Sequence, residues 1–158
     1  MATALYRTGI APEWVDYNSH LRDAYYWVII SLAVDALMDR LGMDETYRTQ
    51  TRCTIYTLEA HIHYLEEVKQ SDVAEVFAHV LDADAKRIHA GFELRCAGHA
   101  GPAAVAEMML LHVRQGETAH AVPFPAAVTA AIESFRRSTG DAPAGRPGSR
   151  RMGLHPKH

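Results

Sequence analysis

The segment from Leu21 to Leu41 is apolar on nearly all of its sides. Its hydrophobic residues recur with helical spacing, and Gly42 follows at the position where many helices end. Ser31, Asp35 and Asp39 form a narrow polar stripe. The spacing predicts a helix of roughly 30 Å, at about 1.5 Å per residue. Because so little of its surface is polar, we expect other elements to wrap this helix.

The chain after this helix predicts the wrapping sheet. A loop-like stretch at residues 43–50 leads into four segments of alternating polarity with short turn-like breaks, which is typical of an antiparallel meander. A shorter alternating segment precedes the helix, and helical spacing returns near the end of the chain. The expected strands are residues 3–11, 53–68, 73–81, 88–96 and 103–114, and the expected closing helix is 126–137. Strict alternation would place Cys53, Glu59, His61 and His63 on one face and Tyr64 on the other.

The length of 158 residues and the 48% hydrophobic content fit one globular domain. We expect this domain to span residues 1–137. Residues 138–158 are rich in glycine, proline and arginine and are expected to form a flexible tail. The formal net charge of −3 does not favour a polyanion-binding surface, so nucleic acid is not an expected partner.

The two cysteines, Cys53 and Cys96, fall in predicted strands, and the sequence has no C-x-x-C motif. Buried, reduced thiols are therefore favoured over a zinc or redox site. The N-terminus lacks the pattern of a signal peptide, and Asp35 and Asp39 interrupt the longest apolar segment. We expect a cytoplasmic protein that neither enters a membrane nor is exported.

A polar, aromatic-rich stretch from Trp14 to Trp27 leads into the long helix. Asn18 and Ser19 are candidate N-caps, so the backbone N–H groups near residues 18–21 would be free at the positive end of the helix. A developing negative charge would be stabilised there. Asp16 and His20 flank the same end and could move protons or orient water. The alternative is an ordinary capped helix start without chemistry.

The order of these elements resembles the hot-dog fold, an α+β fold in which a curved antiparallel sheet wraps around its first long helix. The segment Asp16-Tyr-Asn-Ser-His20-Leu-Arg-Asp23 resembles the Asp-x-x-x-His-x-Asn-Asn-type loop of the 4-hydroxybenzoyl-CoA and acyl-acyl-carrier thioesterase families. More narrowly, Trp14-Val-Asp-Tyr-Asn-x-His-Leu-Arg-Asp-Ala-Tyr-Tyr26 is similar to the betainyl-CoA thioesterases of carnitine breakdown. Leu21-Arg22-Asp23 stands where Val-Asn-Asn is usual in the broader pattern.

The resemblance implies a thioesterase that hydrolyses a short acyl-CoA with water and needs no cofactor. It implies that Asp16 is the general base or the nucleophile, and both roles stay open. His20 would orient Asp16, the substrate or the water. Asn18 would cap the helix or position water. Glu59 would approach the site from the first long strand, or pair with a neighbouring histidine or arginine.

Aromatic rings crowd the helix entrance, and rings can hold a quaternary ammonium group by cation–π attraction worth about 0.5–2 kcal/mol each. This is the physical basis for a betainyl substrate. The alternative is plain hydrophobic packing, which suits Tyr25 because it fits the apolar stripe. We expect two or three of the rings to face a cavity. The candidates are Trp14, Tyr17, Tyr25, Tyr26 and Trp27.

The resemblance also implies a homodimer or a dimer of dimers, with sheets joined edge to edge and active sites between protomers. Two other functions are weighed: a general short- or medium-chain thioesterase, and a non-catalytic acyl-CoA-binding protein of the same fold. Glu59, His61 and His63 have a spacing that could hold a metal, but no third segment completes such a site, so no metal is expected.

Overall fold

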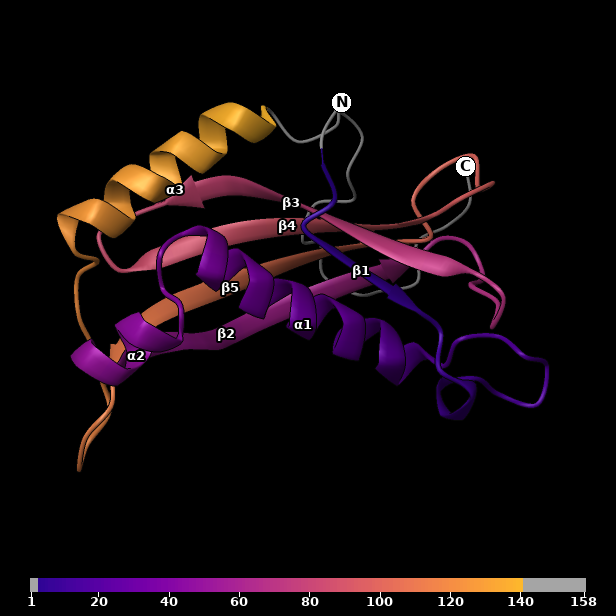
Figure 1. Cartoon of the computed structure of the whole chain (residues 1–158), viewed down its shortest axis with the longest axis horizontal. Helices are drawn as coiled ribbons and strands as arrows, with labels where there is room; N and C mark the ends of the chain where they lie inside the picture. The colour runs from indigo at the N-terminus through magenta and orange to yellow at the C-terminus, as the bar shows by residue number, and fades with distance from the viewer. Residues whose placement is uncertain (1–2, 141–158) are drawn as a thin grey trace, which may run out of the picture.

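The computed structural model describes residues 3–140 and shows a curved antiparallel sheet with a long helix on its concave face (Figure 1). The predicted α+β hot-dog architecture is therefore confirmed. In chain order the elements are β1 (Tyr6–Gly9), the 3-10 turn η1 (Pro12–Trp14), α1 (Asp23–Arg40), α2 (Glu45–Thr51), β2 (Cys53–Tyr64), β3 (Val73–Ala83), β4 (Arg87–Cys96), β5 (Ala104–Arg114), β6 (His120–Ala121) and α3 (Ala126–Thr139).

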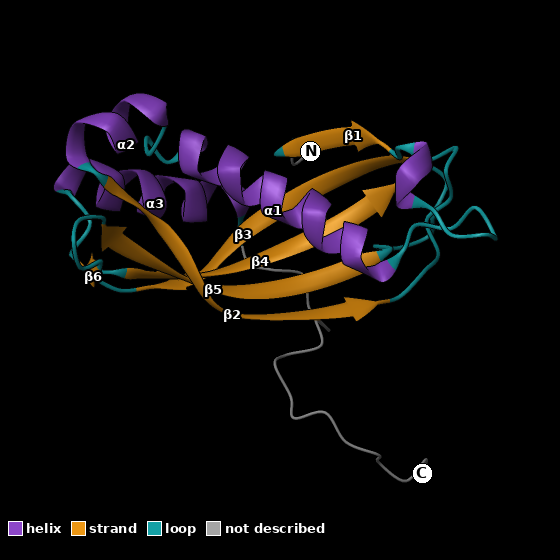
Figure 2. Cartoon of the chain, turned by 90° about the horizontal axis from the view of Figure 1, so that it is seen from below, coloured by secondary structure: helices purple, strands orange, loops and turns teal. Residues whose placement is uncertain are grey.

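The strands lie in the order β1-β3-β4-β5-β2, with β6 added to one end of β5 (Figure 2). Strands β3, β4 and β5 form the predicted meander, but β2 does not pair with β3. It crosses to the far edge of the sheet and pairs with β5 from Cys53↔Arg114 to Tyr64↔Ala104. The prediction of a four-strand meander is therefore wrong for its first strand, because alternation shows which face a strand buries but not which strand it pairs with.

A bulge in the middle of β2 inverts its faces. Thr57 lies opposite Leu110 and Ala60 lies opposite Met108, and both partners are buried residues of β5. Between these pairs β2 has one residue more than β5, and the extra residue is Leu58, which has no partner in the register. Such an extra residue shifts every later side chain to the other face of the sheet. The predicted common face for the odd-numbered residues of this strand is therefore wrong, and Tyr64 points to the side of the sheet that α1 covers.

The long helix begins two residues later and ends one residue earlier than predicted, with Leu41 as its C-cap and Gly42 at φ +80° directly after the cap. Its core-facing side is fully apolar. Val28 and Leu32 nevertheless remain 38% and 37% exposed, so an apolar strip of α1 also faces outward. The buried residues of α1 are Tyr26, Ile29, Ile30, Ala33, Val34, Leu37 and Met38.

Two other predictions need adjustment near the ends of the sheet. Residues 45–51 form the short helix α2 rather than a loop, because the Asp44 side chain caps it by accepting the Tyr47 N–H at 2.9 Å. The closing helix α3 extends to Thr139. Most of the predicted tail, residues 141–158, lies outside the described residues. Within residues 3–140, no helix has the length and apolar character needed to cross a membrane.

Candidate active site

The stretch before α1 is a tight hairpin. Val15 and Leu21 face each other in an antiparallel bridge, and the Asp16 N–H donates to the His20 carbonyl at 2.8 Å. Ser19, at φ +62°, makes the reversal and donates its N–H to the Asp16 carbonyl at 3.0 Å. The sequence suggested Asn18 and Ser19 as N-caps of the helix, and this prediction is wrong. The N-cap of α1 is Arg22, whose side chain forms no capping bond.

The Asp16 carboxylate is held by the backbone of its own hairpin. Its Oδ1 accepts the N–H of Asn18 at 2.8 Å and the N–H of His20 at 3.1 Å. These bonds, with the His20 bond the larger cause, hold the pKa of Asp16 below its ordinary value despite partial desolvation. Oδ2 forms no hydrogen bond with any described residue. The hairpin thus presents one free oxygen of an ionised carboxylate.

The predicted free N–H groups near residues 18–21 are engaged in the structure. Those of Asn18, Ser19 and His20 bond within the hairpin, and the Leu21 N–H donates to the Val68 carbonyl at 2.7 Å. The prediction is therefore wrong, because the hairpin and its neighbour satisfy these donors before the helix begins.

The free donors lie instead in the first turn of α1. Neither the Asp23 nor the Ala24 N–H has an acceptor among residues 3–140. Arg22 brings the Asp16 segment beside this turn, since its N–H donates to the Trp14 carbonyl at 3.0 Å and its Nε to the Val15 carbonyl at 3.1 Å. The hairpin that carries Asp16 is therefore bonded to the start of an 18-residue helix, whose dipole makes that end positive.

A cavity of about 280 Å³ opens at this end of α1. Tyr26 and Tyr64 meet there edge to face, with ring centroids 5.1 Å apart. The Tyr64 hydroxyl donates to the Asp23 carbonyl at 3.3 Å. Burial raises the pKa of both tyrosines, so they stay neutral. The lining combines aromatic rings with carboxylates and consists of Leu21, Asp23, Tyr26, Tyr64, Leu65, Glu66 and Glu67.

A larger cavity of about 580 Å³ lies near the other end of α1, where Arg40 and Phe135 line it. Its lining includes no residue of the first turn of α1, whereas Asp23 and Tyr26 of that turn line the smaller cavity. Asp16 lines neither cavity, but its hairpin ends at Leu21, which lines the smaller one. We therefore place the candidate active site at the smaller cavity.

The five aromatic residues singled out in the sequence have different positions. Tyr26 lines the smaller cavity. Trp14 stacks on Tyr25, with centroids 5.7 Å apart and planes 18° from parallel, and both rings pack against the core. Trp27 also packs against the core, while Tyr17 is 93% exposed. The sequence reasoning missed Tyr64, because the bulge in β2 turns its ring toward α1.

The remaining predicted site residues do not meet at Asp16. The His20 Nδ1 lies 3.4 Å from a carboxylate oxygen of Glu67 at the cavity rim. Glu59 pairs with His61 at 2.8 Å and forms no bond with Asp16 or His20 among the described residues. Among the residues that the structure describes, the side chains of Glu59, His61 and His63 do not bring three possible metal-ligand atoms together.

Residues 10–132 match the model of the thioesterase-like superfamily, and the chain belongs to this family. It is a thioester hydrolase. The chain is 38% identical over 151 residues to the betainyl-CoA thioesterase of Pseudomonas aeruginosa, covering 96% of this chain and 94% of that one. It is 33% identical over 140 residues to the L-carnitine dehydrogenase/betainyl-CoA thioesterase of Rhizobium meliloti, of which it spans only 28%.

Solved structures agree with this assignment. A putative thioesterase from Pseudomonas putida is 36% identical and superimposes with a TM-score of 0.86 over 99% of both chains. A Staphylococcus aureus protein in complex with CoA is 24% identical, with a TM-score of 0.89 over 98% of both chains. The second likeness shows the shared fold.

Proposed function

We propose that this thioesterase hydrolyses betainyl-CoA to betaine and CoA. One observation carries the substrate assignment: the cavity at the start of α1 joins the rings of Tyr26 and Tyr64 to the carboxylates of Glu66 and Glu67. Aromatic faces and nearby negative charge are the groups that attract a trimethylammonium ion. The similarity to a betainyl-CoA thioesterase over most of both chains supports the same substrate.

The proposed reaction uses the two features at the start of α1. Asp16 either removes a proton from the attacking water or attacks the thioester carbon itself, and both roles fit its free Oδ2. The carbonyl oxygen becomes negatively charged and is stabilised by the N–H groups of Asp23 and Ala24 together with the helix dipole. The carbon–sulfur bond then breaks, and CoA leaves as its thiolate, which takes up the proton that Asp16 removed from water. If Asp16 is the nucleophile, this step leaves a mixed anhydride on Asp16, and water hydrolyses it to betaine and the free carboxylate.

In this proposal His20 has a positioning role at the rim of the cavity. Its imidazole lies near Glu67, while its backbone N–H holds Asp16 in place. His20 would therefore position the substrate or water rather than accept the proton directly. Asn18 holds the Asp16 carboxylate by its backbone N–H, so its contribution does not depend on its side chain.

A release assay for free CoA thiol tests the proposal. The panel should contain betainyl-CoA, its uncharged isostere 3,3-dimethylbutanoyl-CoA, and acetyl-, butanoyl- and octanoyl-CoA. We expect kcat/KM for betainyl-CoA to exceed that for the isostere by at least about tenfold, which corresponds to about 1.4 kcal/mol. A flat profile would indicate a general short- or medium-chain thioesterase. Binding of CoA esters in calorimetry without thiol release would indicate a non-catalytic binding protein.

The edge strand β2 supports a homodimer as the working form. One side of β2 pairs with β5, and the other side ends the sheet. Unpaired edges with apolar side chains favour pairing with a second copy. Such a partner would also close the cavity that Tyr64 lines, and a dimer of dimers could build on it. The exposed apolar residues near this edge are Tyr56, Leu58, Tyr64 and Leu65.

A cytoplasmic location is part of the same proposal. Both cysteines, Cys53 and Cys96, are free and buried. Free thiols suit a reducing compartment.

A further inference from the structure

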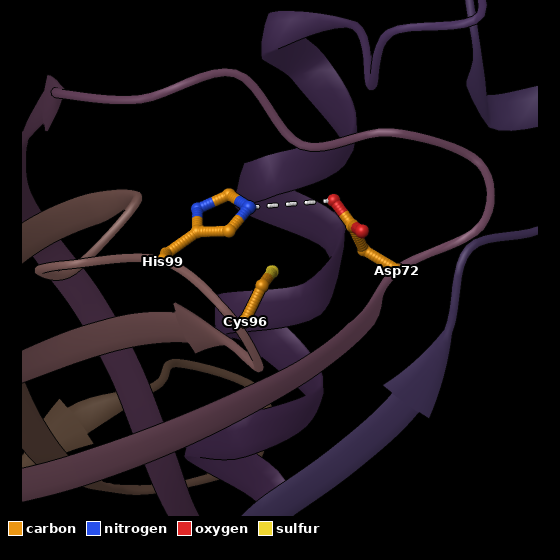
Figure 3. A group of neighbouring side chains, drawn as sticks. All are labelled: Asp72, Cys96 and His99. Carbon is orange, nitrogen blue, oxygen red and sulfur yellow. Dashed lines mark ion pairs between the residues drawn. The ribbon is translucent and has the colours of Figure 1, made fainter.

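The turn after β4 brings a thiol and an imidazole together. Residues 96–99 read Cys-Ala-Gly-His, and the His99 N–H donates to the Cys96 carbonyl at 3.3 Å. Gly98 adopts φ +86°, a conformation that allows this tight reversal and that other residues rarely adopt. Cys96 Sγ and the His99 ring therefore lie on the same side of the turn (Figure 3).

A carboxylate from another segment completes the group. Asp72 directly precedes β3, and Ala74, two residues further along, lies opposite Cys96 in the sheet. The Asp72 side chain is fixed, because its Oδ2 accepts the Lys69 N–H at 2.8 Å. His99 Nε2 lies 3.6 Å from the same oxygen. One sulfur, one nitrogen and one oxygen thus lie within 4.8 Å of one another (Figure 3).

We propose that Asp72, Cys96 and His99 form a zinc site. Thiolate, imidazole and carboxylate are the three ligand types that Zn²⁺ combines in proteins, and a water would take the fourth position. Ligand atoms at about 2.0–2.3 Å from zinc lie roughly 3.3–3.6 Å apart in a tetrahedron, so small side-chain rotations would close the observed group.

Glu66 supports the imidazole in the manner expected at a metal site. Its Oε2 lies 3.0 Å from His99 Nδ1, although off the line of a good hydrogen bond, and this nitrogen is shielded from solvent. A carboxylate at Nδ1 favours the tautomer whose Nε2 lone pair is free for a metal. In the structure, His99 Nε2 faces Asp72.

The charges around Cys96 also fit a cation. The side chain is only 6% exposed, and the carboxylates of Asp72, Glu75 and Glu66 are near enough to act on its thiol. A bound Zn²⁺ would replace the thiol proton and offset these negative charges.

The same surroundings exclude the rival interpretation of a Cys-His-Asp nucleophile. A nucleophilic cysteine needs a thiolate, and carboxylates beside a buried thiol oppose its formation. Cys96 also does not line the cavity at the start of α1. The zinc would instead fasten the segment carrying Glu66 and Asp72 to the turn after β4, directly behind the cavity wall.

Metal binding by the full-length protein tests this site without any measurement of turnover. The protein is stripped with a chelator and titrated with Co²⁺ or Zn²⁺ alone. We expect about one equivalent to bind and Co²⁺ to give a thiolate-to-metal charge-transfer absorption. Cys96→Ser should abolish this absorption, and His99→Gln should weaken binding. Glu66→Gln should weaken it roughly 10–100-fold. Cys53→Ser is the matched control, since Cys53 is equally buried at the α2 end of the sheet.

Three results would overturn the zinc site. The first is a failure of the wild-type protein to bind either metal, a result that does not depend on whether any variant folds. The second is charge transfer that survives Cys96→Ser or disappears in Cys53→Ser. The third is rapid alkylation of Cys96 at neutral pH in the stripped protein, which would indicate an activated nucleophile. Glu66→Gln alters a partly exposed side chain, so this arm does not depend on a substitution in the core.

Discussion

Asp16 and His20 are joined twice: the Asp16 N–H donates to the His20 carbonyl at 2.8 Å, and the His20 N–H donates to Asp16 Oδ1 at 3.1 Å. This pair fixes the carboxylate before substrate arrives, so its orientation costs little at the moment of reaction. The two oxygens of the Asp16 carboxylate therefore have different functions: Oδ1 is held by hydrogen bonds and fixes the orientation, and Oδ2 remains free to react.

Asp16→Asn should lower kcat by roughly 10²–10⁴-fold, because the amide cannot serve as a base or a nucleophile. The fold of the hairpin should survive, since the new amide oxygen can still accept both N–H groups. Thiol release with betainyl-CoA measures the loss. Asp39→Asn, at the far end of α1, is the control and should keep full activity. Wild-type turnover by Asp16→Asn would remove the assigned role.

The acid limb of kcat/KM should lie below pH 3.8, the ordinary value for an aspartic acid, because hydrogen bonds lower the pKa of Asp16. Only the ionised form is active, so activity is retained above this pKa and lost as the pH falls through it. We expect a flat profile from neutral pH to about pH 5. A limb centred near about 6.5, the usual range of imidazole, would instead assign the proton transfer to a histidine.

Tyr64→Leu should raise KM for betainyl-CoA by about 2–30-fold more than for 3,3-dimethylbutanoyl-CoA, which corresponds to the loss of one cation–π contact. The leucine keeps an apolar side chain in the cavity but removes the ring. Tyr56→Leu is the matched control, because Tyr56 is also exposed on β2 but does not line the cavity. Equal losses on the two substrates would remove the cation–π contact from the proposal.

Tyr26→Phe should lower the free energy of unfolding by about 1–3 kcal/mol. The Tyr26 hydroxyl accepts the N–H of the fully buried Val68 at 3.2 Å and lies 3.3 Å from the Glu66 carbonyl. Its removal leaves that buried N–H without a partner. Urea unfolding at equilibrium measures the change, and Tyr56→Phe should be neutral. An unchanged midpoint for Tyr26→Phe would show that another acceptor or a water replaces the hydroxyl.

Leu58→Lys should convert the proposed dimer to a monomer. Leu58 is 56% exposed at the bulge of the edge strand, and a charge at such an edge opposes pairing with a second strand. Light scattering coupled to size exclusion gives the mass. Leu32→Lys on α1 tests whether the exposed strip of the helix belongs to the same interface. A monomeric wild type would contradict the proposal directly.

The sequence predicted α1 and strands β3 to β5 well, because each buries one face or more and its apolar spacing records that burial. It could not place β2. Pairing with β5 depends on contacts between distant segments, and the bulge after Thr57 breaks the alternation that sequence reasoning follows.

At the candidate site, the sequence singled out Asp16, whose role stays a prediction, but it misplaced the start of the helix. Asn18 and Ser19 are good capping residues by type, yet the hairpin uses their N–H groups, and Arg22 stands at the N-cap instead. The zinc ligands were missed for a similar reason. The two metal patterns weighed in the sequence were C-x-x-C and the Glu59, His61 and His63 set, whereas the turn carries C-x-x-H and its third ligand comes from a separate segment.

The crossing of β2 to the far edge also has a kinetic consequence. Strands β3, β4 and β5 are neighbours in the chain and can pair through short turns, whereas β2 must wait for β5 to be made and positioned. During synthesis the α1 and β2 segments emerge before their binding surface exists. The apolar face of α1 would stay exposed in that interval, so folding of this chain should be slow and most prone to aggregation before β5 is complete.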